Sequence, residues 1–469
     1  MASQSPSGIF RRYRWTELGL FIIPFLIVIL EMSQLLLANK DQTSSLSTRN
    51  LPTIQGLIPA IGLIAALLIA NMVMSVFFRK ADQVLLPLVG LLSGIGILMA
   101  TRLGPDLNPF PDPALGSRQL VWVLLGIFVC LATLFLLRNI NLLARYKYTA
   151  AFLGIVLVCT TLVNTLRVKN LDSPTHDQLN LGPFALQPSE LLKICLVIFF
   201  AAYLSENRDI FAEGSLKFGP FRLPPLRQLG PLTLMLGIAL LFFLFVRELG
   251  LALLIYGLFL SMLYLASGKF SYVATGLLIF AALGLIGYSL FSYVRTRFAV
   301  VGFNVVNWQN WTAKDDRFAT NGGLQILQGL IALSSGGILG AGLGLGNPAG
   351  RYFVPVVQSD MVFTALGEEL GLAVLFAIIA IYLLIIYRGF RIAIEATDTF
   401  NQLLAAGLTS IFAIQTFIII AGNMKFLPLT GIPLPFLSYG GSSILANYII
   451  VGILLRISYN TAVERDGTA

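Results

Sequence analysis

The sequence predicts an all-α polytopic membrane protein, and two observations lead to that fold class. Of the 469 residues, 57% are hydrophobic and only 11% are charged, which leaves too little charge to cover the surface of a water-soluble protein of this length. In addition, runs of about 18 or more mostly apolar residues recur along the chain, and each is long enough to cross a bilayer as a helix.

We expect about twelve membrane spans, each taken from the extent of an apolar run. The predicted spans cover residues 17–38, 54–78, 83–101, 119–137, 148–165, 187–205, 230–247, 248–267, 270–292, 361–388, 401–421 and 439–457. The longest polar interval, residues 293–360, is predicted as one large loop. It should carry interfacial or re-entrant helices, because an amphipathic stretch that begins at Leu324 is followed by a glycine-rich run.

The distribution of basic residues predicts how the spans are oriented. Lys and Arg gather in the short loops on one side of the predicted bundle, and such a bias marks the cytoplasmic side. With an even number of spans both termini lie there, and the loop 293–360 faces the extracytoplasmic side. The net charge of +9 fits this bias and attraction to anionic membrane lipids. Nucleic-acid binding is not expected, because the basic residues are scattered among loops.

The small supply of cysteine and histidine narrows the chemistry. Cys130, Cys159 and Cys195 each fall inside an apolar run, and their spacing matches neither a disulfide framework nor a zinc site. His176 is the single histidine, which argues against a His-based metal site and against Ser-His-Asp catalysis. We therefore predict no metal site built from protein ligands.

Two polar features at the ends of apolar runs are candidates for a functional site. Asp360 stands just before the span that begins at residue 361, where it could act as a catalytic base or simply cap the helix. Glu190 and Lys193 lie three residues apart in the first turn of another span. They could line a substrate groove, or form an ion pair on one helix face that stabilises the helix start.

The glycine-rich run could be mistaken for a nucleotide-binding loop. Gly344, Gly346 and Ala349 fit the loose spacing of a dinucleotide fingerprint. No strand precedes them and no βαβ unit is predicted, so the context that gives the fingerprint its meaning is missing. An extracytoplasmic loop would also lie away from the cytoplasmic nucleotide pools. Dinucleotide binding is therefore not expected.

Three stretches together resemble the SEDS family of shape, elongation, division and sporulation proteins, which includes RodA and FtsW. They are 187–193 (QPSELLK), 322–371, which contains SDMVFTALGEELG, and 423–443 (NMKFLPLTGIPLPFLSYGGSS). The resemblance implies a ten-helix core, so the first two spans are extra. The implied organisation is a two-span appendage at 1–80, a glycosyltransferase core at 81–458 and a cytoplasmic tail at 459–469.

The resemblance also implies an activity. Members of the family polymerise lipid II into peptidoglycan strands during elongation or division, with undecaprenyl diphosphate as the leaving group, and they work with a class B penicillin-binding protein. Asp360 matches the candidate catalytic aspartate of the family. The residues expected to bind substrate are Glu190, Lys193, Glu368, Lys425 and Ser438, which fall within the matching motifs, and Arg351, a cation on the same face.

The chemistry of this transfer agrees with the residue types. Inverting transfer needs one general base near the acceptor hydroxyl and a cation near the pyrophosphate, and it needs no protonating acid because pyrophosphate already leaves readily. Asp360 could be the base. The cation candidates are Arg295, Arg297, Arg351 and Lys425. No cofactor is required, although Mg or Mn could be held mainly by the substrate's pyrophosphate.

The helical repeat separates the two glutamates that follow Asp360. Glu368 lies about 80° around the helix from Asp360, so it could share the same cavity. Glu369 lies about 180° around, so we expect it to support packing or to pair with a basic group.

Two other functions stay open at this point. A flippase for lipid-linked precursors would also suit a polytopic chain with charged residues in its spans, although matching inverted halves are not visible. A non-catalytic scaffold of an elongation or division complex is the third reading. The first two spans are hypothesised to pack at the edge of the bundle, since an appendage must not block the entry of a lipid.

Overall fold

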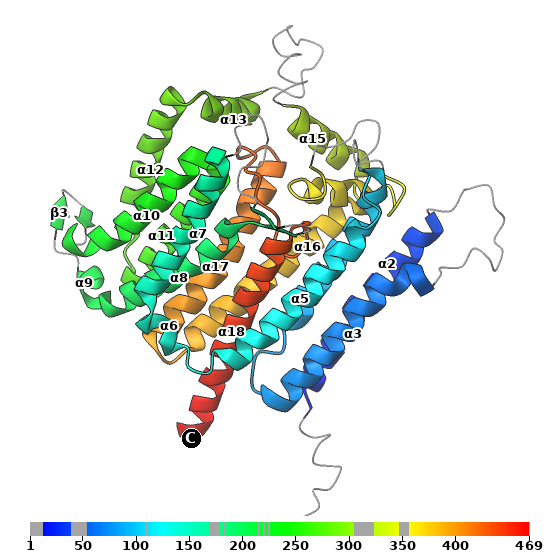
Figure 1. Cartoon of the computed structure of the whole chain (residues 1–469), viewed down its shortest axis with the longest axis horizontal. Helices are drawn as coiled ribbons and strands as arrows, with labels where there is room; N and C mark the ends of the chain where they lie inside the picture. The colour runs from blue at the N-terminus through cyan, green and yellow to red at the C-terminus, as the bar shows by residue number, and fades with distance from the viewer. Residues whose placement is uncertain are drawn as a thin grey trace, which may run out of the picture.

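Apolar helices laid side by side make up almost all of the protein, as the computed structural model shows (Figure 1). The structure describes residues 13–38, 54–107, 111–167, 179–181, 184–213, 216–218, 221–223, 226–246, 248–303, 323–346 and 356–468.

Each predicted span is found as a helix. The long helices are α2 (Trp15–Ala38), α3 (Ile54–Phe77), α4 (Leu85–Leu103), α5 (Leu115–Leu136), α7 (Lys147–Arg167), α8 (Pro188–Glu206), α10 (Leu226–Val246), α11 (Leu249–Ser267), α12 (Phe270–Leu290), α16 (Val362–Glu395), α17 (Thr399–Asn423) and α18 (Gly441–Thr468). Within the described residues, ten helices are long and apolar enough to cross a membrane. The other two, α7 and α10, are 21 residues long, but their described apolar parts are shorter.

Short elements lie between these helices. They are the 3₁₀ turn η2 (Gly104–Asp106), the helices α6 (Asn141–Arg145), α9 (Arg208–Glu213), α13 (Ser292–Gly302) and α15 (Leu324–Gly336), and two antiparallel hairpins, β1 (Leu179–Leu181) with β2 (Phe184–Leu186) and β3 (Leu216–Phe218) with β4 (Phe221–Leu223). The predicted all-α class is therefore correct for the bundle, and the hairpins belong to connections. Helices α13 and α15 supply the helical parts expected in the large loop.

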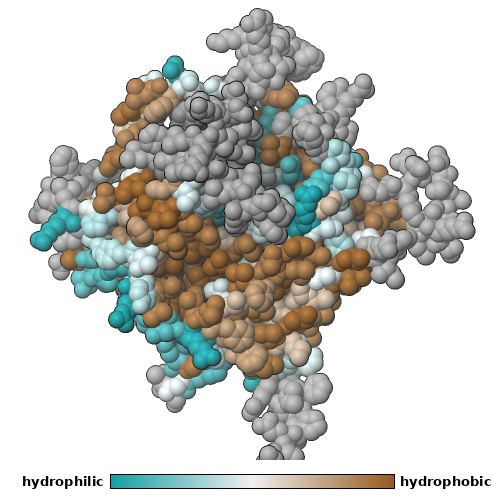
Figure 2. Space-filling model, in the orientation of Figure 1, coloured by the Kyte–Doolittle hydropathy of each residue, from teal (hydrophilic) through white to brown (hydrophobic). Residues whose placement is uncertain are grey.

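The bundle has a buried centre and an apolar rim. Of the apolar window in each helix, 89% of α8 but only 6% of α12 is buried inside the protein. Helix α12 therefore lies at the periphery, opposite the edge formed by α2 and α3 (Figure 1). On the face shown in Figure 2, hydrophobic residues gather across the middle and hydrophilic ones mainly toward the rim. An apolar belt of this kind is what a bilayer requires of a helical protein.

Two helices run further than the sequence analysis expected. Helix α16 continues to Glu395 rather than ending near residue 388, and α18 continues through Thr468 rather than ending near residue 457. The residues assigned to a tail after 458 are therefore helical. Contacts between the two extensions stabilise them, since Thr397 bonds to Glu464 and Arg465 donates to the carbonyl of Glu395. Apolarity alone could not locate these ends.

Helix α16 is broken one third of the way along. Gly371 has φ 78° and ψ 174°, a left-handed conformation that glycine adopts without strain. The glycine-rich segment, residues 337–346, supplies the hydrogen bonds that the break interrupts. The amides of Ala341 and Gly342 donate to the carbonyls of residues 368 and 369, while residues 372 and 373 donate to the carbonyls of Gly337 and Ile338. The break thus leaves few backbone groups unpaired.

Helices α2 and α3 pack against the outer side of α4 and α5 (Figure 1). Two glycines of α4 make room for them. A β-carbon at Gly90 would lie 2.8 Å from Leu67 of α3, and one at Gly94 would lie 2.5 Å from Val28 of α2. Small residues one turn apart let helices approach closely within a membrane. The two helices thus lie at the bundle edge, as hypothesised; that they form a separate domain stays a prediction.

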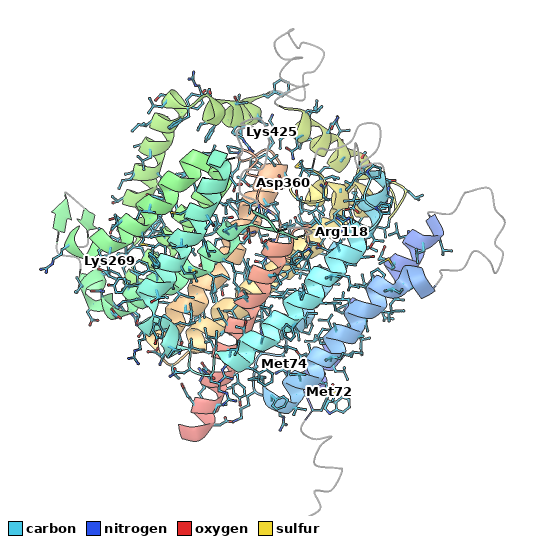
Figure 3. All side chains as sticks on the ribbon, in the orientation of Figure 1. Met72, Met74, Arg118, Lys269, Asp360 and Lys425 are labelled. Carbon is cyan, nitrogen blue, oxygen red and sulfur yellow. The ribbon has the colours of Figure 1, made fainter. Side chains whose placement is uncertain are left out.

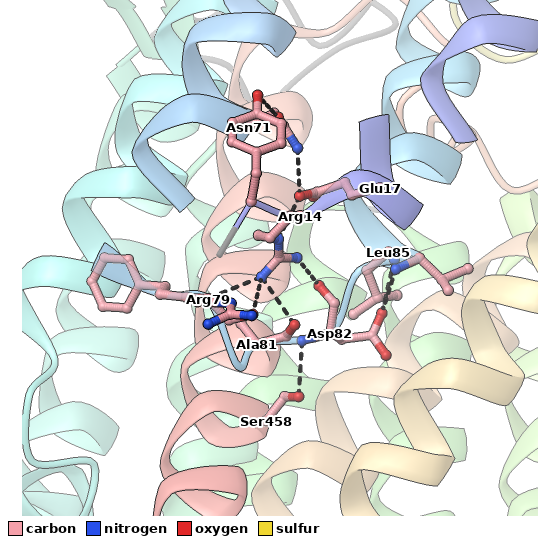
Figure 4. Close-up of polar contacts among 11 residues, drawn as sticks. Arg14, Glu17, Asn71, Arg79, Ala81, Asp82, Leu85 and Ser458 are labelled. Atoms are coloured by element: carbon pink, nitrogen blue, oxygen red, sulfur yellow. Dashed lines mark hydrogen bonds and ion pairs between the residues drawn. The ribbon is translucent and has the colours of Figure 1, made fainter. Parts of the chain in front are cut away.

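Arg14 fastens this edge to the rest of the bundle (Figure 4). Its guanidinium is buried, pairs with Glu17 at 2.6 Å, and donates to the carbonyls of Phe78, Ala81 and Asp82 at 2.6–3.0 Å. These carbonyls follow the end of α3, where a helix leaves acceptors without intrahelical partners. One arginine therefore closes the end of α3 and holds the start of α2.

Asp82 extends the same network into the core. Its carboxylate accepts hydrogen bonds from the amides of Val84 and Leu85 at 2.8 and 3.0 Å, at the start of α4 (Figure 4). It also pairs with Arg388 of α16, and its own amide donates to the hydroxyl of Ser458 in α18. Helices α2, α3, α4, α16 and α18 thus meet in one polar cluster at this end of the bundle.

Candidate active site

Asp360 lies at the other end of the bundle, on the turn that leads into α16 (Figure 3). Its side chain is partly exposed, and Lys425 is drawn at the same end of the molecule. Asp360 immediately precedes Met361, the N-cap residue of α16. A turn on a connecting segment is a usual place for a residue that must meet a substrate.

The backbone around Asp360 is held by the last residue of α17 and by residues that follow this helix. Asn423 donates its amide to the carbonyl of Asp360 at 3.0 Å, and the hydroxyl of Ser438 donates to the carbonyl of Ser359. The amide of Tyr439 donates to the carbonyl of residue 358 at 2.8 Å. Ser438, predicted as a substrate-binding residue, therefore contacts the turn that carries Asp360.

The segment that supplies these contacts is itself inserted into the bundle. This inserted loop, residues 424–440, lies between α17 and α18, and the apolar side chains of its second half, from Ile432 to Leu437, are buried. Its carbonyls need partners because irregular backbone inside a membrane protein has no water to bind. Gln415 donates to the carbonyl of Pro433 at 2.7 Å, Tyr382 to that of Pro435 at 2.5 Å, and Gln119 to that of Ser438 at 3.2 Å.

Glu190 and Lys193 belong to the support of this loop. They form the expected ion pair, 2.9 Å long, and both are buried in protein. Lys193 also donates to Gln415 at 2.8 Å, and Gln415 in turn holds Pro433. The pair therefore reaches the inserted loop through one glutamine. Contact of Glu190 or Lys193 with a substrate stays a prediction.

The surroundings of Asp360 raise its basicity. Burial raises the pKa of the carboxyl to about 6, because nearby protein disfavours its charged form. The hydroxyl of Ser359, 3.0 Å from Oδ1, and the guanidinium of Arg297 act in the opposite direction. The group is still mostly ionised at neutral pH, yet it holds a proton more firmly than an ordinary aspartate. A pKa near the working pH suits a general base.

Two of the candidate cations come to the same end of the bundle. Arg297 of α13 donates to the carbonyl of Leu429 in the inserted loop at 2.6 Å. Lys425 donates to the carbonyl of Phe303, just after α13, and partial burial lowers the pKa of Lys425. Both could approach an anionic group beside the carboxylate. Of the other two candidates, Arg295 is an exposed residue of α13, and Arg351 lies outside the described residues.

Strained backbone gathers at this end. Val356, Lys425 and Phe436 are the described non-glycine residues with positive φ, at 55°, 63° and 65°. All three lie in the turn before Asp360 or in the inserted loop. Each such conformation costs about 1–2 kcal/mol, and strain of this kind is frequent at functional sites. We infer that the packing of the inserted loop imposes these conformations.

The two glutamates after Asp360 behave differently. Glu369 is fully buried and pairs with Arg102 of α4 at 2.8 Å, so the expectation that it pairs with a basic group is confirmed. Glu368 is partly exposed and lies beside Gly346 of the glycine-rich segment. The role of Glu368 toward a substrate stays a prediction.

Several residues of the site were missed by sequence reasoning. Gln119, Tyr382, Gln415 and Asn423 each lie within an apolar helix and hold the inserted loop or the Asp360 turn. A polar side chain inside a membrane span is costly unless it has a partner, so each was a signal in principle. The partner of each residue, however, could not be read from the sequence.

Fold and site together define a multi-pass membrane protein with a carboxylate at one end of its bundle, the end where Arg297 and Lys425 also lie. Comparison with known families assigns it further. The model of the cell cycle protein family FTSW_RODA_SPOVE matches residues 83–463. The chain therefore belongs to the family of FtsW, RodA and SpoVE, and the predicted SEDS membership is confirmed.

Relatives with curated names agree. The peptidoglycan glycosyltransferase RodA of Mycobacterium tuberculosis is 38% identical over 393 residues, which cover 83% of this chain and 80% of that protein. The protein of the same name from Mycobacterium leprae is 36% identical over 399 residues. A probable peptidoglycan glycosyltransferase FtsW from Geobacter metallireducens is 34% identical over 275 residues, covering 59% of this chain and 67% of that protein.

Solved structures share the fold. One, described as a peptidoglycan synthase complex that coordinates polymerization and crosslinking, contains a chain with a TM-score of 0.63 and 22% identity; the match covers 81% of this chain and 98% of that one. The rod shape determining protein RodA of Thermus thermophilus matches with a TM-score of 0.55 and 21% identity, over 81% and 96% of the two chains.

Proposed function

We infer that this chain is a peptidoglycan glycosyltransferase that polymerises lipid II in the cell membrane, with Asp360 as the general base. The names of its relatives support the activity, and the family match over residues 83–463 covers every candidate site residue. The observation that carries the assignment of the base is the partly exposed residue Asp360, whose carboxyl pKa is raised to about 6 by burial.

The proposed step balances with these groups. The acceptor hydroxyl attacks C1 of the donor sugar, a C–O bond forms, and the bond from C1 to the phosphate oxygen breaks. Undecaprenyl diphosphate leaves with the bonding electrons, and Asp360 takes the hydroxyl proton. Attack from the face opposite the leaving group inverts the configuration. A single carboxylate is enough, because the leaving group needs no proton.

The charge on the leaving pyrophosphate calls for a cation. Arg297 and Lys425 are the described cations closest to this role, since each binds a backbone carbonyl next to the site. A guanidinium or ammonium aimed at developing charge stabilises the transition state. A divalent cation such as Mg or Mn would be held mainly by the pyrophosphate itself.

The orientation follows from charge. Arg79, Lys80, Arg138, Arg391 and Arg456 lie in or near connections at the end opposite Asp360, and this end is proposed to be cytoplasmic by the positive-inside rule. The site then faces the extracytoplasmic side, where lipid II is presented. A class B penicillin-binding protein is proposed as partner, because one structural neighbour comes from a complex that couples polymerization to crosslinking.

Polymer formation by the purified protein tests the proposal. The full chain, co-purified with its penicillin-binding partner, is incubated in detergent with lipid II, where no compartments exist for a flippase to connect. We expect glycan strands from the wild type and a rate lower by about 10²–10⁴-fold for Asp360→Asn.

Asp112→Asn is the matched control, since Asp112 carries an exposed-side ion pair with Arg118 and no assigned role. Absence of polymer from the wild-type complex would contradict the enzyme and leave the flippase or scaffold. Full activity of Asp360→Asn would remove this residue as the base.

A further inference from the structure

Arg102 occupies a buried position that the proposed chemistry does not use. It lies in the last turn of α4, with 6% of its surface exposed. Its guanidinium donates through Nε to Glu369 at 2.8 Å and through Nη2 to the carbonyl of Gly346 at 2.8 Å, and it also pairs with Asp106. The three nitrogens of one guanidinium group thus donate hydrogen bonds to three separate segments.

Glu369 is fixed on both of its oxygens. Oε1 accepts from Arg102, and Oε2 accepts from the amide of Gly344 at 3.2 Å. Gly346 leaves no space for another side chain, because a β-carbon there would lie 2.7 Å from the Glu369 side chain. The carboxylate therefore joins α4 to the glycine-rich segment, residues 337–346.

This carboxylate lies at one end of a short helical piece, and Asp360 lies at the other. The break at Gly371 separates Val362–Leu370 from the rest of α16. Nine residues of helix span about 14 Å, so the piece is short and stiff. Because of the break, the long part of α16 does not fix the rotation of this helical piece about its axis. Contacts with other segments must therefore fix it. Arg102 and the glycine-rich segment supply them at the end that carries Glu369.

The pair differs from an ordinary surface ion pair. Both charges are buried. The nitrogens of Arg102 and both carboxylate oxygens of Glu369 have hydrogen-bond partners. A buried ion pair is weak evidence for stability, because desolvation offsets attraction, but its geometry can specify one arrangement of the segments that it joins. Here that arrangement includes the direction of the helical piece behind Asp360.

We propose that Arg102 is a positioning residue for catalysis: through Glu369 and Gly346 it fixes the helical piece Val362–Leu370, and thereby the place of Asp360 at its other end. This inference rests on the proposed role of Asp360 as base. Arg102 itself touches no reacting atom. Its loss should therefore lower turnover while substrate binding is retained.

Three variants of the full chain test this role: Arg102→Lys, Arg102→Gln and Glu369→Gln. We expect kcat lower by about tenfold to a hundredfold in the two glutamine variants, because small misplacements of a catalytic group have effects of this size, with KM within about twofold of wild type. Arg102→Lys keeps the positive charge but loses the planar guanidinium, so its kcat should lie between those of the wild type and the glutamine variants. The control is Arg118→Gln, an arginine of α5 at the same end whose ion pair with Asp112 is exposed (Figure 3).

A second measurement does not depend on turnover. Amide hydrogen exchange at Ala341, Gly342 and Leu372 reports the bonds across the break in α16. Exchange at these amides should quicken in Arg102→Gln and Glu369→Gln and stay unchanged in Arg118→Gln. If a single variant does not purify as a monodisperse protein, the double variant Arg102→Gln/Glu369→Gln replaces it, since it leaves no unpaired buried charge between the two positions.

The outcomes separate the two claims. Full turnover of Asp360→Asn would overturn the proposed base, whatever the Arg102 variants do. An inactive Asp360→Asn together with wild-type kcat in folded Arg102→Gln and Glu369→Gln would overturn the positioning role alone. A rise in KM with kcat unchanged would also overturn it, because that result would assign Arg102 to substrate binding.

Discussion

The carboxylates of Asp82 and Asp360, at opposite ends of the bundle, have different surroundings. At the end that holds Arg14 and Asp82, buried charges are paired with each other and with backbone groups, and they join five helices (Figure 4). At the other end, the carboxylate of Asp360 accepts one hydrogen bond among the described residues, from Ser359, and stays partly exposed. Charged groups that stabilise the fold are paired within it, whereas a charged group that must contact a substrate stays partly exposed.

The backbone shows the same contrast. Positive φ at non-glycine residues is confined, within the described chain, to Val356, Lys425 and Phe436 at the Asp360 end. The Arg14 end contains none of them. The strain is accommodated because the inserted loop is held by Gln119, Tyr382 and other side chains from the core. Stability and function are thus placed at separate ends, and substitutions can test that separation.

The largest effect on stability is expected from Arg14→Ala. It leaves Glu17 buried without its cation, and loss of one partner of a buried pair typically costs about 3–5 kcal/mol. The unfolding temperature measured in detergent should fall strongly, whereas turnover per folded molecule should be unchanged. Arg391→Ala is the control, since its exposed pair with Glu395 is worth about 0.5 kcal/mol or less. Normal stability of Arg14→Ala would end the contrast between the two ends.

An intermediate effect is expected from pH. Because Asp360 must be ionised to act as base and its pKa is raised to about 6, kcat/KM should fall about tenfold per unit below that pH and level off above it. The sign for stability is reversed: a carboxyl whose pKa rises on folding favours the folded state at low pH, and this contribution is lost as pH climbs from about 4 to about 6.

Ser359→Ala sharpens that prediction. The Ser359 hydroxyl lowers the pKa of Asp360, so its removal should move the midpoint of the rate profile to higher pH. A profile that stays flat from pH 5 to 8 in both proteins, measured at saturating partner, would show that Asp360 does not titrate in this step.

The smallest effect is expected from a comparison of two substitutions at one strained position. Lys425→Gly and Lys425→Met both remove the amino group, so both should slow polymerisation to the same extent. Only glycine relieves the positive φ of 63°, so Lys425→Gly should be more stable than Lys425→Met by about 1 kcal/mol. Equal unfolding temperatures would show that Lys425 is not strained.

Local patterns carried most of the fold. Every predicted span is a helix, because a run of about 20 apolar residues needs no distant contact to be recognised. The pairing of Glu190 with Lys193 followed from a spacing of three residues on a helix. The position of Asp360 at the end of a span followed from its place beside an apolar run.

Contacts between distant segments could not be predicted in this way. Arg102 and Glu369 are 267 residues apart, and Ser438 lies 79 residues from Ser359. The sequence showed the glycine at position 371 but not that a glycine-rich segment would occupy the break. The ends of α16 and α18 were placed too early for a similar reason, since their last turns depend on each other.

The inserted loop also has a consequence for how the protein is made. The side chains that donate hydrogen bonds to its carbonyls, Gln119, Tyr382 and Gln415, all precede it in the chain. Their helices are therefore synthesised before the loop emerges. Ser438, which fastens the Asp360 turn, is synthesised after that turn. A nascent chain therefore contains Asp360 before the loop that fixes its position has been made.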